Sequence, residues 1–235
     1  MPGSAQIWRE QLDRPVWNAL TTRWAEIAEG DARAWRIDRA YGVFGAAADR
    51  SPESMTALAA LVPENGELWV VEREDWPAPP GTRVLRRAAC VQMVCDALTP
   101  GTSPAFEIVE LAEDDAPAMY DLALLTQPGP YAAHTNRLGE FIGVKHDGAL
   151  IAMAGERMKM PGLSEVSGVC THPDHRGKGY AGVLMRVVAD RMLARGETPW
   201  LHAYASNTGA IALYRSLGFR HHGTVTASVL VRDTG

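Results

Sequence analysis

The chain has 235 residues and carries 23 basic against 28 acidic side chains, a formal net charge of −5. This balance argues against a general nucleic-acid-binding protein, which needs a basic surplus, and no apolar run approaches the roughly 20 residues of a membrane span. The N-terminal residues lack the basic and apolar segments of a secretory signal. The cysteines Cys90, Cys95 and Cys170 have no Cys-x-x-Cys spacing and suit reduced thiols. These features predict a cytoplasmic globular protein.

The first hundred residues predict an α/β unit. Apolar spacing predicts a helix over 15–30, and Ser51 followed by Pro52 is typical of a helix start, here continuing to Leu61. The other elements expected here are strands over 32–38, 41–48 and 67–72 and an apolar stretch over 82–97. The segment 99–104 contains proline and small residues, so it predicts a linker between domains of residues 1–100 and 104–235.

The second half predicts a longer series of alternating strands and helices. Its expected elements are a strand over 106–111, a helix over 113–125, an irregular segment over 127–138, strands over 140–145, 149–158 and 165–171, a helix over 180–196, a strand over 199–205, a helix over 207–217 and two closing strands within 219–232. Asp147-Gly148 is typical of a two-residue hairpin turn. The predicted order is βαβββαβαββ.

A glycine-rich turn between the strand at 165–171 and the next helix has the properties of an anion site. The first N–H groups of a helix have no intrahelical partner and carry partial positive charge. Gly177 and Gly179 let the backbone approach a ligand closely. Arg176 and Lys178 add formal charge beside them. The turn therefore predicts a phosphate- or pyrophosphate-binding site.

Two familiar phosphate motifs do not fit this turn. The spacing Gly177-x-Gly179-x-x-Gly182 matches the dinucleotide fingerprint, but too little chain follows for a Rossmann fold, and Glu197 precedes the strand where the acidic partner should stand. A P-loop needs Gly at the position of His172 and Ser or Thr at the position of Gly179.

What remains is Arg176-x-x-Gly179-x-Ala181 directly after a strand, and this pattern resembles the acetyl-CoA pyrophosphate loop of the GNAT acyltransferase superfamily. The run from Asn207 through Tyr214 to Gly218-Phe219 resembles the last GNAT motif, and the element order after residue 104 is similar to that of the family. The resemblance covers about 130 residues.

The resemblance implies a GNAT fold of the α/β (α+β) class, with a mixed, mostly antiparallel sheet and helices on both faces. Residues 1–100 would form a smaller α/β domain that is loosely similar to a degenerate GNAT-like copy without a phosphate loop. This domain would shape the acceptor pocket or form a dimer contact.

The resemblance also implies which residues hold acetyl-CoA as acyl donor. The strand would pair with the pantetheine through its main chain, the turn and the start of the helix would hold the pyrophosphate, and residues of the last motif would contact the pantetheine arm and the thioester sulfur. The expected cofactor-binding residues are Val169, Cys170, Thr171, Arg176, Gly177, Lys178, Gly179, Tyr180, Ala181, Asn207 and Tyr214.

Two catalytic roles follow from the same resemblance. Tyr214 would be the general acid for the departing thiolate. Glu165 resembles the catalytic Glu of glycine N-acyltransferase-like members and would deprotonate the acceptor, because an alkylamine is mostly protonated at pH 7. Glu156 on the preceding strand is the alternative base, and a structural role for both stays open. His202 and Tyr204 alternate on the next strand, where they either border the acceptor pocket or pack.

In an ideal strand, Glu165 shares a face with Ser167, Val169 and Thr171, although a bulge would shift this alternation.

The predicted function is acyl-CoA-dependent N-acetyltransfer to a primary amine by direct attack in a ternary complex, in a monomer or homodimer without metal, nucleic acid or membrane partners. Cys170 lacks an evident base for covalent catalysis. The histidines, His172 and His175 among them, lack zinc-site spacing. The alternative functions are a non-catalytic acyl-CoA-binding sensor or assembly module and, third, a nucleotide-binding regulator. The acceptor amine is not specified by these patterns.

Overall fold

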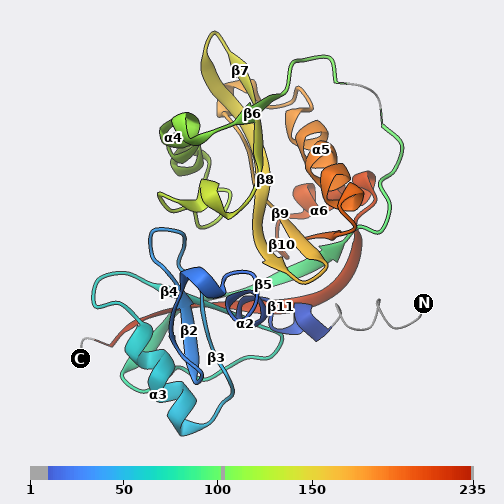
Figure 1. The fold of residues 1–235 in the computed structure, drawn as a ribbon. Helices are drawn as coiled ribbons and strands as arrows, with labels where there is room; N and C mark the ends of the chain where they lie inside the picture. Colours follow the sequence, from blue (N-terminus) through green and yellow to red (C-terminus); the bar gives the residue numbers. More distant parts are fainter. Residues whose placement is uncertain (1–9, 102–103, 234–235) are drawn as a thin grey trace.

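The computed structural model describes residues 10–101 and 104–233, and its main feature is an eight-stranded sheet (Figure 1). The strands in spatial order are β4 (Leu68–Glu72), β11 (Arg220–Arg232), β5 (Thr82–Val94), β10 (Thr198–Tyr204), β9 (Leu163–Thr171), β8 (Ala149–Met160), β7 (Phe141–His146) and β6 (Val109–Leu111). All neighbouring strands are antiparallel except β9 and β10. The predicted mixed, mostly antiparallel sheet is confirmed.

Helices cover both faces of this sheet, as predicted. α4 (Ala116–Thr126) and α5 (Tyr180–Ala194) lie on opposite sides of β8 and β9 in Figure 1, and α6 (Thr208–Leu217) lies beside α5. α4 buries Met119 and Leu122 against Cys170. α5 buries its apolar stripe, including Leu184 and Val188, in a separate cluster on the other face. No helix in the described ranges is long and apolar enough to cross a bilayer.

The N-terminal part adds a second, three-stranded sheet and two helices. They are α2 (Pro15–Leu20), β1 (Ala28–Asp31), β2 (Ala34–Ile37), β3 (Gly45–Ala47) and α3 (Pro52–Leu61). The predicted helix start is confirmed, because the Ser51 side chain accepts a hydrogen bond from the Ser54 N–H. The predicted helix over 15–30 is wrong in length, since α2 ends at Leu20 and a 3₁₀ turn, Ala25–Ile27, and β1 follow.

The large sheet is continuous across the predicted domain boundary. β5 pairs with β10 and β11, and β4 pairs with β11. The division into domains of residues 1–100 and 104–235 therefore stays a prediction. The large sheet contains strands from both sides of this boundary.

The end of the chain differs from the prediction. One long strand, β11, replaces the two expected closing strands, and the order after residue 104 is βαβββαβαβ. β11 pairs with β5 over most of its length, with register shifts between His221 and Gly223 and between Val229 and Leu230. The chain therefore continues through register shifts within β11 where a turn between two strands was expected. The Asp147-Gly148 hairpin turn is confirmed, with φ of 49° and 81°.

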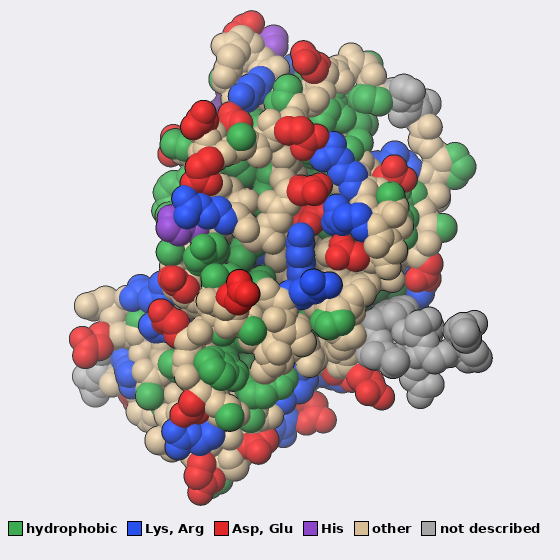
Figure 2. Space-filling view, viewed as in Figure 1, with side chains coloured by type: hydrophobic (Ala, Val, Ile, Leu, Met, Phe, Trp, Pro, Cys, Tyr) green, Lys and Arg blue, Asp and Glu red, His purple; other side chains and the backbone are tan. Residues whose placement is uncertain are grey.

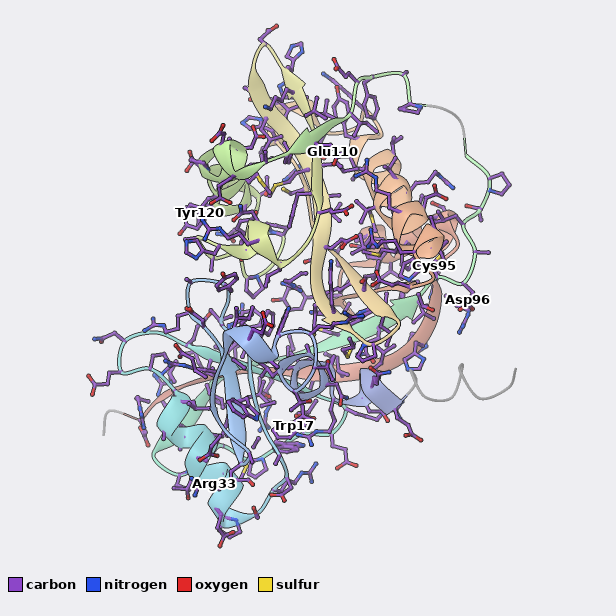
Figure 3. All side chains as sticks on the ribbon, in the orientation of Figure 1. Trp17, Arg33, Cys95, Asp96, Glu110 and Tyr120 are labelled. Carbon is purple, nitrogen blue, oxygen red and sulfur yellow. The ribbon has the colours of Figure 1, made fainter. Side chains whose placement is uncertain are left out.

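Surface charge is mixed on the face shown in Figure 2, where acidic and basic side chains are interspersed. Some of these charges tie elements together. Glu110 of β6, labelled in Figure 3, forms a salt bridge of 2.5 Å with Arg191 of α5. Exposed pairs of this kind contribute little to stability because water screens them.

Candidate active site

The site begins where β9 and β10 separate. The two strands pair only at Leu163–Glu165 and Thr198–Trp200, in parallel. Beyond these residues β9 continues to Thr171 and β10 to Tyr204 with no further pairing between them. Main-chain donors and acceptors on the facing edges are thus left for another partner. An amide-containing ligand can pair with such edges as an added strand would.

A bulge in β9 decides which side chains face the opening. Gly168 has φ of +63°, and a Cβ at this position would lie 2.8 Å from Cε1 of Phe141, so both conformation and space require glycine. One extra residue lies on β9 between its pairings with Gly155 and Met153 of β8. As a result Val166 and Val169 both pack toward α5. The ideal alternation that placed Glu165 and Val169 on one face is therefore wrong.

A groove runs along the open edge of β9 to the start of α5. Every predicted cofactor-binding residue lines it, and the wall facing them includes Thr126, Gln127 and Pro128 at the end of α4. Gly177 and Gly179 both have φ of +79°, and a Cβ at either would meet nothing within 4 Å. The groove-lining residues expected from the sequence are Val169, Cys170, Thr171, Arg176, Gly177, Lys178, Gly179, Tyr180, Ala181, Asn207 and Tyr214.

Asn207 and Tyr214 come from the beginning and the middle of α6. The Asn207 side-chain oxygen accepts a hydrogen bond from the Ala210 N–H and caps the helix, which leaves its NH₂ group able to donate to a ligand. Burial raises the pKa of Tyr214, so its phenol stays protonated at neutral pH. Tyr214 lines both the groove and a second, adjoining pocket.

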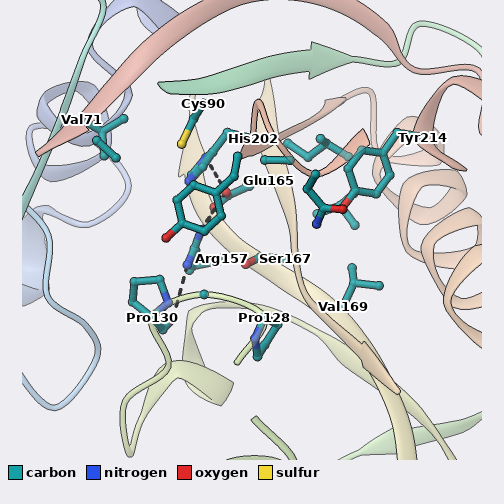
Figure 4. Close-up of a pocket in the computed structure, with 18 of the residues that line it drawn as sticks. Val71, Cys90, Pro128, Pro130, Arg157, Glu165, Ser167, Val169, His202 and Tyr214 are labelled. Carbon is teal, nitrogen blue, oxygen red and sulfur yellow. Dashed lines mark hydrogen bonds and ion pairs between the residues drawn. The ribbon is translucent and has the colours of Figure 1, made fainter. Parts of the chain in front are cut away.

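The second pocket lies on the other side of Tyr214 and is shown in Figure 4. Apolar walls come from Trp69 and Val71 of β4 and from Cys90 of β5. The loop after α4 contributes residues 128–130, and β8, β9 and β10 contribute polar groups. Strands from the first hundred residues therefore wall a pocket that opens beside the groove.

The polar groups of this pocket form one ionic cluster around Glu165. Its Oε1 is 2.9 Å from Nη2 of Arg157 and 2.9 Å from Nδ1 of His202. Its Oε2 accepts hydrogen bonds from Nε of Arg157 at 3.0 Å and from the Met158 N–H at 3.2 Å. Burial alone would raise the pKa of Glu165, but the positive charges of Arg157 and His202 outweigh it and lower the pKa to about 2.

Comparison with known proteins agrees with this geometry. The FR47-like protein family model matches residues 141–229. A crystal structure from Novosphingobium aromaticivorans, assigned to the GNAT family of acetyltransferases, is 49% identical to this chain with a TM-score of 0.89, and covers 95% of this chain and 99% of that one. The chain belongs to the GNAT family of acetyltransferases. Both the predicted family and the predicted enzyme class are thereby confirmed.

Two curated GNAT relatives match a shorter stretch. N-alpha-acetyltransferase RimI of Mycobacterium tuberculosis is 33% identical over 103 residues, which are 41% of this chain and 64% of the relative. The [ribosomal protein bS18]-alanine N-acetyltransferase of Escherichia coli is 29% identical over 118 residues, 48% of this chain and 79% of the relative. The chain thus spans less than two thirds of the first relative's length, and each match covers less than half of this chain.

The alternative base, Glu156, lies outside both clefts of this GNAT chain. It is 1% exposed and its carboxylate contacts Lys159 at 2.5 Å and the Arg195 guanidinium that follows α5. It is absent from the residues that line the groove and the pocket. Cys170 lines the groove, but burial raises the pKa of its thiol to about 11, which disfavours a thiolate nucleophile.

Sequence reasoning missed Arg157 and the pocket walls of this GNAT site. An arginine inside the largely apolar run 149–160 was a usable signal, because a buried arginine needs a buried anion. Trp69 and Val71 gave no signal, since their run reads as an ordinary buried strand. The His175 ring contacts those of His146 and His172, but across residues 10–101 and 104–233 no group of three or more potential ligands is placed to hold a metal ion.

The low pKa of Glu165 makes a pH-dependent contribution to stability. A glutamate in the unfolded chain has a pKa of about 4.3, higher than the folded value of about 2. The contribution is therefore fully present above the unfolded pKa and is lost as the pH falls toward 2. We expect the stability difference between the wild type and Glu165→Gln, measured by urea denaturation, to shrink between pH 5 and pH 2. A difference that stays constant over this range would contradict the pKa assignment.

Proposed function

We propose that this acetyltransferase moves an acetyl group from acetyl-CoA to a primary amine of a small molecule or an amino acid, by direct attack in a ternary complex. The observation that carries the proposal is that a glycine-lined groove and a charged pocket meet at Tyr214. A donor in the groove and an acceptor in the pocket would bring thioester and amine together, which is the arrangement that direct transfer needs.

In the groove, the proposed donor site uses main chain and charge. Gly177 and Gly179 with the first N–H groups of α5 would hold the pyrophosphate, and Arg176 and Lys178 would add positive charge. The open edge of β9 at Val169–Thr171 would pair with the pantetheine amides, and Asn207 would donate to the same arm. A free N–H of this edge would also stabilise the oxyanion that forms at the thioester carbonyl.

In the pocket, the proposed acceptor is a small amine. The charge of Glu165 is paired with that of Arg157, and Tyr214 is the proposed acid for the departing thiolate. Trp69, Val71 and Cys90 lie outside the region that the family model matches, so this chain builds its pocket wall from its own N-terminal half. That wall supports a compact acceptor with an apolar part.

A peptide N-terminus is a second candidate acceptor, favoured by the similarity to a [ribosomal protein bS18]-alanine N-acetyltransferase. A non-catalytic acyl-CoA sensor is the alternative of a different class. The proposed location is the cytoplasm, which suits three buried free thiols, and the proposed state is a monomer or homodimer.

Acetyl-CoA is expected to raise the melting temperature by about 5–10 °C at one hundred times its Kd, because it binds only the folded chain. Arg176→Ala combined with Gly179→Asp should abolish this shift by removing one charge and placing a carboxylate at the pyrophosphate position. Differential scanning fluorimetry measures both.

The matched control for this experiment is Arg33→Ala combined with Gly81→Asp. Arg33 lies in the turn between β1 and β2 and lines neither cleft, and Gly81 also has a positive φ, +69°, with open space around it. This double variant should keep the rise in melting temperature that acetyl-CoA causes in the wild type. Absence of any shift in the wild type would overturn the donor site.

The acceptor is then identified by release of free CoA thiol in the presence of amino acids, polyamines, aminoglycosides and peptide N-termini. Turnover with small amines supports the proposal. Turnover with peptides alone would favour the second candidate, and tight acetyl-CoA binding with no turnover on any amine would favour the sensor.

A further inference from the structure

We propose that His202 is the general base that takes the proton from the acceptor's ammonium group, and that Glu165 is a positioning residue that orients and charges the His202 ring. This inference rests on the proposed function and replaces Glu165 with His202 as the group that touches the acceptor.

Glu165 has no room for direct proton transfer. The residue is 1% exposed, and four contacts from Arg157, Met158 and His202 occupy its two oxygens. A carboxylate that accepts this many donors in a buried site is a weak base, because protonation would cost the ion pair. Glu165 can therefore orient the side chains that contact it.

His202 has the complementary arrangement. Its Nδ1 faces Glu165 Oε1 at 2.9 Å, and the ring lies 5.8 Å from the Trp200 ring at an interplanar angle of 33°. Nδ1 is enclosed and meets the carboxylate as an ion-pair contact without a formed hydrogen bond, whereas Nε2 is not among the enclosed polar atoms of the described residues. A hydrogen on Nδ1, beside the carboxylate, would leave the Nε2 lone pair for the acceptor. Figure 4 shows His202 and Glu165 close together among the residues that line the pocket.

The separation of the two strands explains why His202 is available. Trp200 is the last β10 residue paired with β9, and its partner is Glu165. His202 follows two residues later on the same face, as the strand period requires. At this point β10 no longer pairs with β9. The His202 side chain therefore lies in the opening between the two strands and still contacts the Glu165 carboxylate. Tyr204, the next residue on this face, lines the pocket as well.

The proton balance of the reaction uses both ends of the site. His202 Nε2 takes one proton from the ammonium group, and Glu165 stabilises the imidazolium that forms. The neutral amine attacks the thioester carbonyl, the C–S bond breaks, and the thiolate takes the Tyr214 proton. The second amine proton is released as the amide forms and restores the phenol, while His202 returns its proton to water. One proton leaves per acetyl group transferred.

Several charged or titratable groups face the His202 ring. They are Glu165 of β9, Arg157 of β8, Cys90 of β5, Tyr204 of β10 and Tyr214 of α6. Glu165 is the group in contact with Nδ1.

The test uses the full-length protein with an amine that the wild type acetylates. We expect His202→Gln to lower kcat by about 10²–10³-fold and to leave the acetyl-CoA thermal shift unchanged. Added imidazole should restore part of the activity of His202→Ala. The acidic limb of the pH–kcat profile should move to lower pH in Glu165→Gln, because removing the negative charge makes the ring less basic.

His221→Gln, an exposed histidine of β11, is the matched control and should keep wild-type kcat. Equal activity of His202→Gln and wild type would overturn the inference while the proposed function stands. The inference would also be overturned by a pair of results. In this pair, Glu165→Gln is inactive but still shows the acetyl-CoA thermal shift, and His202→Gln keeps the pH–kcat profile of the wild type. If Glu165→Gln does not fold, the activities of the His202 variants and the imidazole rescue test the inference without it. A wild type that acetylates no amine would overturn the proposed function and this inference together.

Discussion

Replacing Arg157 with methionine is expected to destabilise the protein by about 3–5 kcal/mol, the usual cost of removing one partner from a buried ion pair. The Arg157 and Glu165 side chains are 8% and 2% exposed, so the remaining carboxylate would stay out of reach of water. The guanidinium also lies 5.0 Å from the centre of the Phe44 ring, where methionine retains only the apolar contact. Urea denaturation at pH 7 measures the free energy of unfolding.

Two further variants make this result interpretable. Arg33→Met removes an exposed pair with Asp31, whose side chains are 60% and 48% exposed, and should change stability little because water screens the charges (Figure 3 labels Arg33). The double variant Arg157→Met with Glu165→Gln removes both buried charges and should recover much of the loss. A loss in Arg157→Met no larger than in Arg33→Met would show that the pair does not hold the site together.

Changing Tyr214 to phenylalanine is expected to lower kcat by about 10²-fold or more while acetyl-CoA binding stays within about twofold. The variant keeps the ring that packs 6.4 Å from Phe219 and removes only the hydroxyl at the junction of groove and pocket. A thiolate leaving group has a pKa of about 8.5, and it departs more slowly when no acid protonates it. Steady-state release of CoA thiol measures kcat, and the thermal shift measures binding.

Tyr120→Phe is the control for the loss of a phenol. Tyr120 lies on the exposed side of α4 and is 36% exposed (Figure 3), away from the residues that line either cleft. It should keep wild-type kcat. If Tyr214→Phe also turns over at the wild-type rate, the thiolate leaves without help from this residue and the acid must be water.

The sequence located the residues of the groove, but it did not locate the walls of the pocket beside it. Arg176, Gly177 and Gly179 could be singled out because a turn of the kind that can bind phosphate through its own backbone is a pattern of neighbouring residues. The acceptor pocket needs Trp69, Arg157 and His202 to meet, and these residues come from three strands that no local pattern joins. The sequence therefore could not predict the partners of Glu165. Its resemblance to a catalytic glutamate gave no information about the side chains that contact its carboxylate.

The amino-acid sequence by itself determined the features that depend on short-range backbone preference. These are the α5 start after Gly179, the Asp147-Gly148 hairpin and the order of elements from β6 up to β11. Only the tertiary structure decided how far β9 and β10 stay paired, where the Gly168 bulge reverses the alternation, and which strands wall the pocket. Strand pairing and burial are set by contacts between distant residues, and such contacts exist only once the whole sheet has formed.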